Sequence, residues 1–114
     1  MRHVTPQPTE GPLTEPVLLI LMALVDRPRH GYALMKEIEA LSQGRVRLST
    51  GTMYGALRRL LGDEWIERFE SDDTSREKQA YRLTAPGRRQ LQLELERMKK
   101  LTRAGMARLR LREA

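Results

Sequence analysis

The sequence predicts a mainly helical α+β fold, a winged helix-turn-helix with an added C-terminal dimerisation helix. Apolar residues recur at helical spacing in four segments, and two short segments with alternating apolar and polar residues flank a polar loop. The expected order is helix, helix, short strand, helix, hairpin, helix. At 114 residues the chain suits one domain. We expect an arm over residues 1–12, the winged helix-turn-helix over 13–84 and the dimerisation helix over 85–114, with a generic α+β domain as the alternative.

The N-terminal segment predicts a flexible arm that leads into an apolar helix. Residues 1–12 hold three prolines and one glycine with almost no apolar side chains. Thr14 stands where an N-cap is expected, and Pro16 suits the first turn of a helix. This helix is expected to run to about Asp26, because Pro28 disfavours helical backbone in the residue before it. Since the helix is apolar on every side, we expect it at the centre of the core or partly in a subunit interface.

A second helix is expected from His30 or Gly31 to Leu41, with Gly44 as its stop signal. Its predicted buried stripe comprises Leu34, Ile38 and Leu41. Residues 45–48 alternate in polarity and predict a short strand before the third helix.

The third helix follows Ser49, its expected N-cap, and buries a stripe of Met53, Leu57 and Leu60. The opposite face is small, hydroxylated and basic, a pattern that suits the major groove of DNA. Hydroxyls and the helix N-terminus bind phosphates, glycines permit close approach, and arginine binds phosphate or guanine. The predicted DNA contacts of this segment are Ser49, Thr50, Gly51, Thr52, Tyr54 and Arg58. Core packing is the alternative for Tyr54, and a solvated surface is the alternative for Arg58 or Arg59.

The charge pattern of the same segment supports this interpretation. Between residues 45 and 62, four arginines occur without a single acid: Arg45, Arg47, Arg58 and Arg59.

The next elements predict a hairpin. Residues 65–69 and 80–84 alternate in polarity, and the polar stretch 71–79 between them forms the expected tip. Arg76 and Lys78 lie in this tip and are predicted to contact DNA, where a wing meets the sugar-phosphate backbone. The alternative is that Arg76 and Lys78 belong to a charged loop and only balance the acidic residues next to them.

The last helix is expected to follow Thr84 as its cap and to continue for about two dozen residues. Its apolar stripe has no remaining partner in so small a domain except the first helix, so we expect the two to form a homodimer interface. The alternative is that the last helix packs only within its own protomer and completes the core there. The predicted interface residues are Leu18, Leu21, Leu91, Leu95, Met98, Leu101 and Leu109.

Composition excludes several classes of function. The chain has no cysteine and two histidines, which leaves too few groups for a catalytic triad, a metal site or a cofactor, so we expect no enzyme activity. The longest apolar run, residues 17–25, is too short to span a membrane, and we expect a cytoplasmic protein. The net charge of +6 favours a polyanionic partner, but all of the excess lies in residues 86–114.

Several motifs resemble the PadR family of bacterial transcriptional regulators. The resemblance rests on His30-Gly31-Tyr32, on residues 48–54 and 56–60 of the third helix, and on residues 78–84 followed by Gly87. The chain departs from the family where Gly55 replaces a usual proline, Glu64 a usual glycine and Trp65 a common leucine. The one short C-terminal helix is similar to the small subfamily. That helix has no aromatic residue, unlike small members that stack aromatic ligands on a tryptophan there.

The resemblance implies a dimeric repressor that binds double-stranded DNA at a palindromic operator, with a small-molecule effector as a candidate releasing signal. It also implies that Tyr54 and the hydroxyls of Ser49, Thr50 and Thr52 face DNA. The alternative is a winged-helix module that binds protein or RNA.

Overall fold

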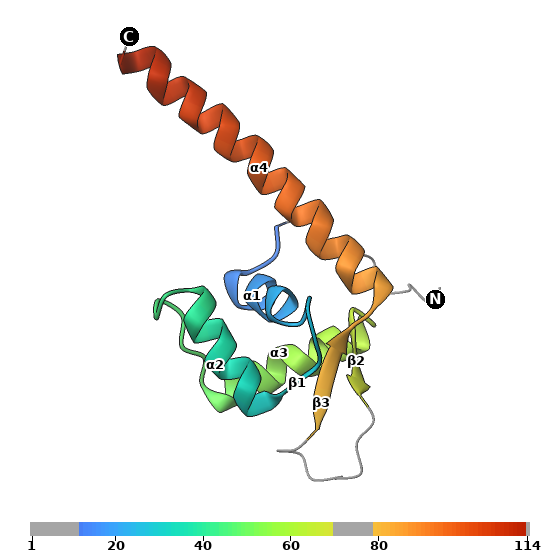
Figure 1. Ribbon diagram of the computed structural model, residues 1–114. Coiled ribbons are helices and arrows are strands. Elements are labelled where there is room, and N and C mark those ends of the chain that lie inside the picture. The colour runs from blue at the N-terminus through green and yellow to red at the C-terminus, as the bar shows by residue number, and fades with distance from the viewer. Residues whose placement is uncertain (1–11, 70–78, 114) are drawn as a thin grey trace, which may run out of the picture.

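Helices and a small sheet make up residues 12–69 and 79–113, the part of the chain that the computed structural model describes (Figure 1). The elements are α1 (Glu15–Ala23), β1 (Arg29–His30), α2 (Gly31–Leu41), α3 (Thr50–Gly62), β2 (Ile66–Phe69), β3 (Ala80–Leu83) and α4 (Ala85–Glu113). The sheet is antiparallel with strand order β1-β3-β2. These elements confirm the predicted mainly helical fold with a hairpin and a long last helix.

The apolar helix α1 lies at the centre of the core. Leu19, Ile20 and Leu21 are buried, and α1 packs against α2, α3 and α4. In Figure 1, α4 crosses above α1 while α2 and α3 lie below it. Burial of an apolar helix on all sides is what its sequence predicts.

Helix α1 is shorter than predicted. Thr14 caps it as expected, its hydroxyl oxygen accepting the Val17 N–H at 3.3 Å. The helix ends at Ala23, however, so the prediction that it reaches Asp26 is wrong. The side chain of Arg29 folds back and donates from Nε to the Ala23 carbonyl at 2.7 Å, which satisfies one of the free carbonyls at the helix end.

The short strand also lies elsewhere than predicted. Residues 45–48 form no strand, and β1 lies before α2 instead. Arg29 and His30 pair with Tyr81 and Ala80 of β3, whose other edge holds β2, so β3 has no free edge for a further strand. Residues 45–48 are anchored instead by the Ser42 hydroxyl, which accepts the Val46 N–H at 3.0 Å.

The turn into the hairpin and the start of α4 are joined tightly. Glu64 has a positive φ of 63°, in the backbone region that favours glycine. This agrees with the glycine that is usual at this position in the family that the sequence resembles. Thr84 donates its hydroxyl to the Glu64 carbonyl at 2.7 Å and accepts the Gly87 N–H at 3.0 Å, which confirms it as the cap of α4. Gly87 is buried against the backbone of Trp65.

Glu94 is the one buried charged residue within 12–69 and 79–113. Its carboxylate accepts two hydrogen bonds from Arg97, at 3.0 and 2.7 Å, and one from the Leu13 N–H at 3.2 Å. The bonds from Arg97, and then the bond from Leu13, outweigh the effect of burial and lower the pKa of Glu94 below its usual range. Glu94 thus ties the segment before α1 to α4.

We expect Glu94→Gln to lower the free energy of unfolding by about 1 kcal/mol at neutral pH, through loss of charge-assisted hydrogen bonds. Because the folded pKa is lowered, this contribution is complete above the unfolded pKa and disappears as the pH falls through the folded pKa. Urea unfolding of both proteins at one protein concentration, between pH 7 and about pH 3, should show the two curves converging in acid. A gap independent of pH would contradict the assignment.

Candidate nucleic-acid interface

The N-terminus of α3 carries the predicted hydroxyl residues. Ser49 caps the helix: its Oγ accepts the Thr52 N–H at 3.1 Å and donates to Thr52 Oγ1 at 2.9 Å. Thr50, Gly51 and Thr52 are exposed on this first turn. The backbone N–H groups and positive dipole end of α3 therefore open onto a surface of hydroxyls, which suits phosphate oxygens.

Glycines and Arg58 continue the outer face of α3. A methyl group added at Gly51 would meet nothing within 4 Å, and one at Gly55 would lie 3.8 Å from Arg58 Nη2. Arg58 is exposed. The predicted inward stripe is confirmed, because Met53, Leu57 and Leu60 are all buried. This face therefore lets another molecule approach the helix backbone closely, next to a guanidinium.

Tyr54 is half-buried between α3 and α2. Its hydroxyl lies so close to Gly31 that a Cβ there would overlap it. Tyr54 therefore contributes to packing between the two helices, while its edge lines a hollow of about 360 Å³ with Tyr32, Met35 and Thr50.

Tyr32 of α2, which the sequence analysis named only as part of a family motif, lines the same hollow, and Lys36 lies over its ring. Tyr32 is 70% exposed, and the Lys36 ammonium lies 5.4 Å from its ring centroid. An aromatic ring this exposed, with a cation over it, offers a hydroxyl and a charge beside the N-terminus of α3. The sequence carried two signals for Tyr32: its place in the His30-Gly31-Tyr32 motif, and its position as a large aromatic on the otherwise polar side of its helix.

The net positive charge around residues 45–62 is lower in the fold than the sequence of this segment predicts. Arg47 donates from Nε to Glu39 of α2 at 2.9 Å. The expectation that no acid offsets the four arginines is therefore wrong, because an acid from outside the segment pairs with one of them. Glu39 lies six residues outside the acid-free window, and only the fold brings it close. Arg45 and Arg58 remain exposed without an ion pair within the described ranges.

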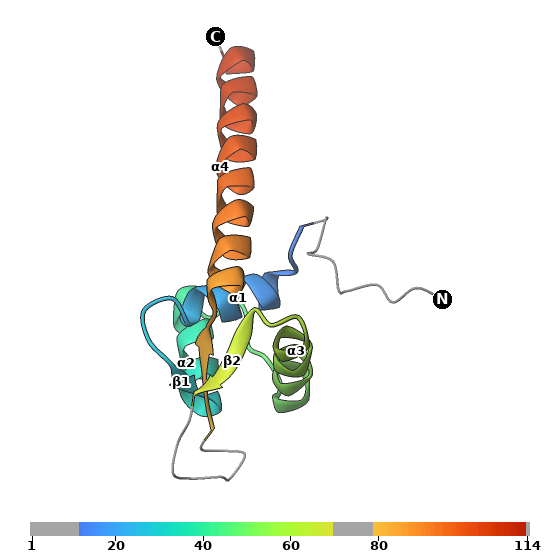
Figure 2. The ribbon, with the colours of Figure 1, turned by 90° about the vertical axis from the view of Figure 1, so that its right-hand side faces the viewer.

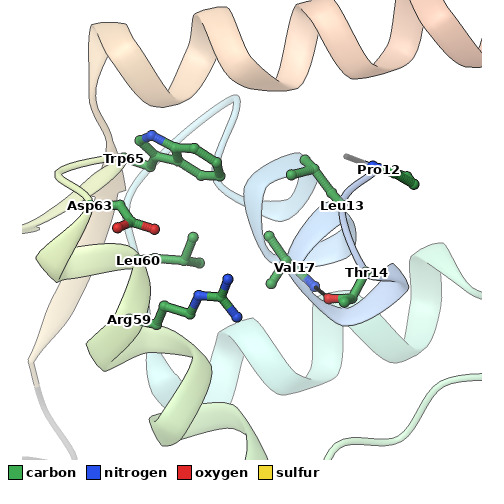
Figure 3. Close-up of a pocket in the computed structure, with 8 residues that line it drawn as sticks. All are labelled: Pro12, Leu13, Thr14, Val17, Arg59, Leu60, Asp63 and Trp65. Carbon is green, nitrogen blue, oxygen red and sulfur yellow. Dashed lines mark hydrogen bonds between the residues drawn. The ribbon is translucent and has the colours of Figure 1, made fainter. Parts of the chain in front are cut away.

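Arg59 faces a different way from Arg58. Together with Asp63, Trp65 and the start of α1 it borders a cavity of about 50 Å³ (Figure 3). Figure 3 shows its guanidinium reaching toward Val17 and Thr14. A cavity of this size holds a few waters and not an organic ligand.

The wing strands carry polar side chains across the hairpin. Arg82 donates to Glu67 at 2.7 Å, and its guanidinium lies 5.3 Å from the Phe69 ring centroid. The predicted contacts Arg76 and Lys78 lie outside the described residues.

The predicted dimer residues separate into two groups. Leu21 and Leu91 are buried within the protomer, and Leu18 is half-buried. The other four lie exposed along α4: Leu95, Met98, Leu101 and Leu109. A partner would therefore meet mainly the distal part of α4.

Two further features bear on function. No helix in the described ranges is long and apolar enough to cross a membrane. Nor do residues 12–69 and 79–113 contain a cluster of three or more histidine or acidic side chains that could hold a metal ion.

Comparison with known sequences gives a match over most of the chain. The model of the transcriptional regulator PadR-like family matches residues 20–93. A curated relative, an uncharacterized 37.1 kDa protein in transposon TN4556 of Streptomyces fradiae, is 38% identical over 85 residues. This match takes in 75% of the present chain but 23% of that protein, so the chain spans about a quarter of the length of this relative.

Solved structures share the fold. A PadR family transcription regulator from Clostridium difficile superposes with a TM-score of 0.70 at 23% identity, covering 84% of this chain and 99% of that one. A PadR family regulator from Eggerthella lenta gives a TM-score of 0.61 at 29% identity, covering 82% and 79%. The arrangement of helices, sheet and long last helix is thus similar to that of these regulators.

Proposed function

This chain belongs to the transcriptional regulator PadR-like family, a family of DNA-binding regulators and not of enzymes, and we propose that it is a repressor that binds a palindromic operator as a homodimer. Under this proposal the winged helix-turn-helix spans 13–84, and residues 85–114 form the dimerisation helix. The protein acts in the cytoplasm, where its operator is.

The outer face of α3 is the observation that carries the proposal. It combines exposed hydroxyls at a positive helix end, two glycines without side chains and an exposed arginine, while the inner face is fully buried. This combination suits a recognition helix, which lies in the major groove with its N-terminal residues at the base edges. Under the proposal Arg58 contacts guanine or phosphate, and Ser49, Thr50 and Thr52 contact phosphate.

Neighbouring elements would add contacts to the DNA backbone. The first helix of a helix-turn-helix crosses the DNA backbone. Under the proposal, Tyr32 and Lys36 of α2, beside the N-terminus of α3, would contact the backbone there. Arg76 and Lys78 would contact the backbone from the wing. Tyr54 contributes mainly by fixing α3 on α2 through Gly31.

A small-molecule effector that releases the DNA is the remaining part of the proposal. An apolar groove of about 370 Å³, lined mainly by Val25, Leu91 and Leu95, is large enough for such a ligand. It lies between the end of α1 and α4, so a ligand there would shift the two helices expected to join the subunits.

Selection from a random duplex library tests the proposal and identifies the operator in the same experiment. We expect enrichment of an inverted repeat whose half-sites lie about one helical turn apart. Titration of the enriched duplex against a scrambled duplex, at a stated salt concentration, then gives the specificity ratio. Failure to enrich any sequence, with equal affinity for both duplexes, would contradict sequence-specific binding.

Gly55→Ala tests whether operator binding requires the absence of a side chain at this position of α3. Alanine should stabilise α3 by up to about 1 kcal/mol, because Gly55 lies within the helix and the added methyl meets only an ordinary contact. The same methyl would stand between the helix and the groove, so we expect about tenfold weaker operator binding. Gly62→Ala, at the far end of α3, is the matched control and should leave affinity unchanged. Unchanged or tighter binding by Gly55→Ala would show that the backbone does not approach DNA there.

A further inference from the structure

The distal part of α4 carries a run of positive charge that contains no acid. From Arg97 to Arg112 the helix has seven lysines and arginines and no aspartate or glutamate. All seven side chains are exposed. Figures 1 and 2 both show this part of α4 projecting away from α2, α3 and the sheet. The charge is therefore concentrated on a helix surface that the rest of the protomer leaves open.

Three of these cations share one side of the helix. Lys100, Arg103 and Arg110 are separated by three and seven residues, which places them within a sector of about 80° at 3.6 residues per turn. We call these three residues the basic ridge. In the same sector, Ala107 is the residue between Arg103 and Arg110. A small side chain there leaves both guanidinium groups accessible to a flat or convex partner.

The ridge cations are not neutralised within the protein. In this run of α4, Arg97 forms an ion pair, with Glu94 at 2.7 Å. Within residues 12–69 and 79–113, none of the ridge residues Lys100, Arg103 and Arg110 forms an ion pair. Like charges three or four residues apart on a helix destabilise it slightly. A bound polyanion would relieve this repulsion and release its own counterions.

We propose that the basic ridge binds a second DNA duplex, independently of its sequence, while α3 holds the operator. The ridge extends about 15 Å along the helix axis, a length over which duplex DNA presents about nine phosphate charges. Each ridge cation therefore has phosphate oxygens within reach. The inference rests on the operator binding proposed above for the first duplex, and it makes the protein a bridge between two segments of DNA.

The position of the ridge is the reason to assign it a separate duplex. Helix α4 has 29 residues and is about 43 Å long, and its distal half lies beyond the core. In Figure 1, α4 and α3 lie on opposite sides of α1. A straight duplex against the outer face of α3 does not reach the ridge, and one bent around the protein would pay an elastic cost. A second duplex meets the ridge without bending.

Charge complementarity favours DNA over a membrane as the partner. A helix that lies on a lipid surface buries an apolar face in the bilayer. The exposed apolar side chains Leu95, Met98 and Leu109 lie on a different side of α4 and are assigned above to the homodimer. The ridge itself offers positive charge with only Ala107 between two of its arginines. Such a surface suits a line of phosphates and buries little apolar area.

Fluorescence anisotropy with a scrambled duplex, at several salt concentrations, tests the ridge. The ridge variant is Arg103→Gln/Arg110→Gln, and glutamine keeps a similar helix propensity at these exposed positions. The matched control is Arg27→Gln/Arg89→Gln, which removes the same charge from two exposed arginines outside the ridge. Both variants and their parent also carry Arg58→Ala, so that the α3 face contributes less to binding.

We expect the ridge variant to bind the scrambled duplex about fivefold more weakly at low salt, with a salt slope smaller by about 2. The control should stay within about twofold of the parent, because long-range steering by net charge changes equally in both variants. Equal losses for the two variants would assign the effect to net charge and overturn the proposal. Unchanged binding by the ridge variant would overturn it as well.

Capture on beads tests whether the second duplex is separate from the operator. With Arg58 intact, protein is bound to the immobilised operator selected above, and a fluorescent scrambled duplex is then added. The unmodified protein and the control should retain the fluorescent duplex, and the ridge variant should retain several-fold less. All three proteins should remain on the operator in equal amounts. Weaker operator binding by the ridge variant would show that the operator itself reaches α4 and would contradict a second duplex.

Two further outcomes separate the proposals from each other. Sedimentation of the protein with phosphatidylserine vesicles, lost in the ridge variant while binding of the scrambled duplex is unchanged, would make the partner a membrane and overturn the assignment to DNA. If selection enriches no sequence, the operator function fails. The anisotropy titration needs no operator, so it still decides whether the ridge binds DNA.

Discussion

Gly87→Ala is expected to lower the free energy of unfolding by about 3 kcal/mol. A Cβ at this position would overlap the carbonyl oxygen and carbon of Trp65, which are backbone atoms and not a movable side-chain end. That backbone is held on both sides: the Trp65 N–H donates to Leu60 at 3.0 Å, and its carbonyl accepts from Thr84 at 3.1 Å. The clash can be relieved only by shifting α4 away from the hairpin.

Urea denaturation at a fixed protein concentration measures this effect. Gly62→Ala is the matched control, because it makes the same chemical change at a helical glycine with nothing within 4 Å of the added methyl. We expect the control to be neutral or slightly stabilising. Equal stability of the two variants would show that α4 does not pack on Trp65 as described.

Arg58→Ala is expected to weaken operator binding by about tenfold to a hundredfold, the range for a lost arginine contact to guanine. Arg58 is exposed on the outer face of α3, and the Gly55 backbone lies under its guanidinium. If the contact is to phosphate instead, affinity should fall similarly on all duplexes, and the salt slope should decrease by about 1.

Arg59→Ala provides the control one residue along the same helix. Its guanidinium points toward α1 and the cavity beside Trp65, away from the outer face (Figure 3). Fluorescence anisotropy at several salt concentrations should show nearly unchanged affinity for this variant. Equal losses for both variants would mean that general positive charge, and not the outer face of α3, determines binding.

Local rules predicted most of the elements. The caps Thr14, Ser49 and Thr84 each form the predicted hydrogen bond, and the stripe of α3 is buried as its spacing indicates. Caps and helical stripes depend on residues within four positions of each other, so the sequence contains them directly.

Features that depend on distant pairing were missed. The two-residue strand β1 has no periodicity of its own and exists because β3 offers it an edge. The ion pair between Arg47 and Glu39 needs the loop before α3 to fold back beside α2. The contact of Tyr54 with Gly31 needs α3 to lie against the start of α2. For the candidate site, sequence patterns thus gave the composition of the α3 face but not the neutralisation of Arg47 or the exposure of Tyr32.

Hydroxyl-radical footprinting on the selected duplex tests most directly whether the outer face of α3 binds DNA. The protein should protect two patches about one helical turn apart, with Arg59→Ala giving the same pattern and Arg58→Ala reducing protection at equal protein concentration. Protection by Arg58→Ala equal to that of the unmodified protein, or no protection at low salt, would contradict the account.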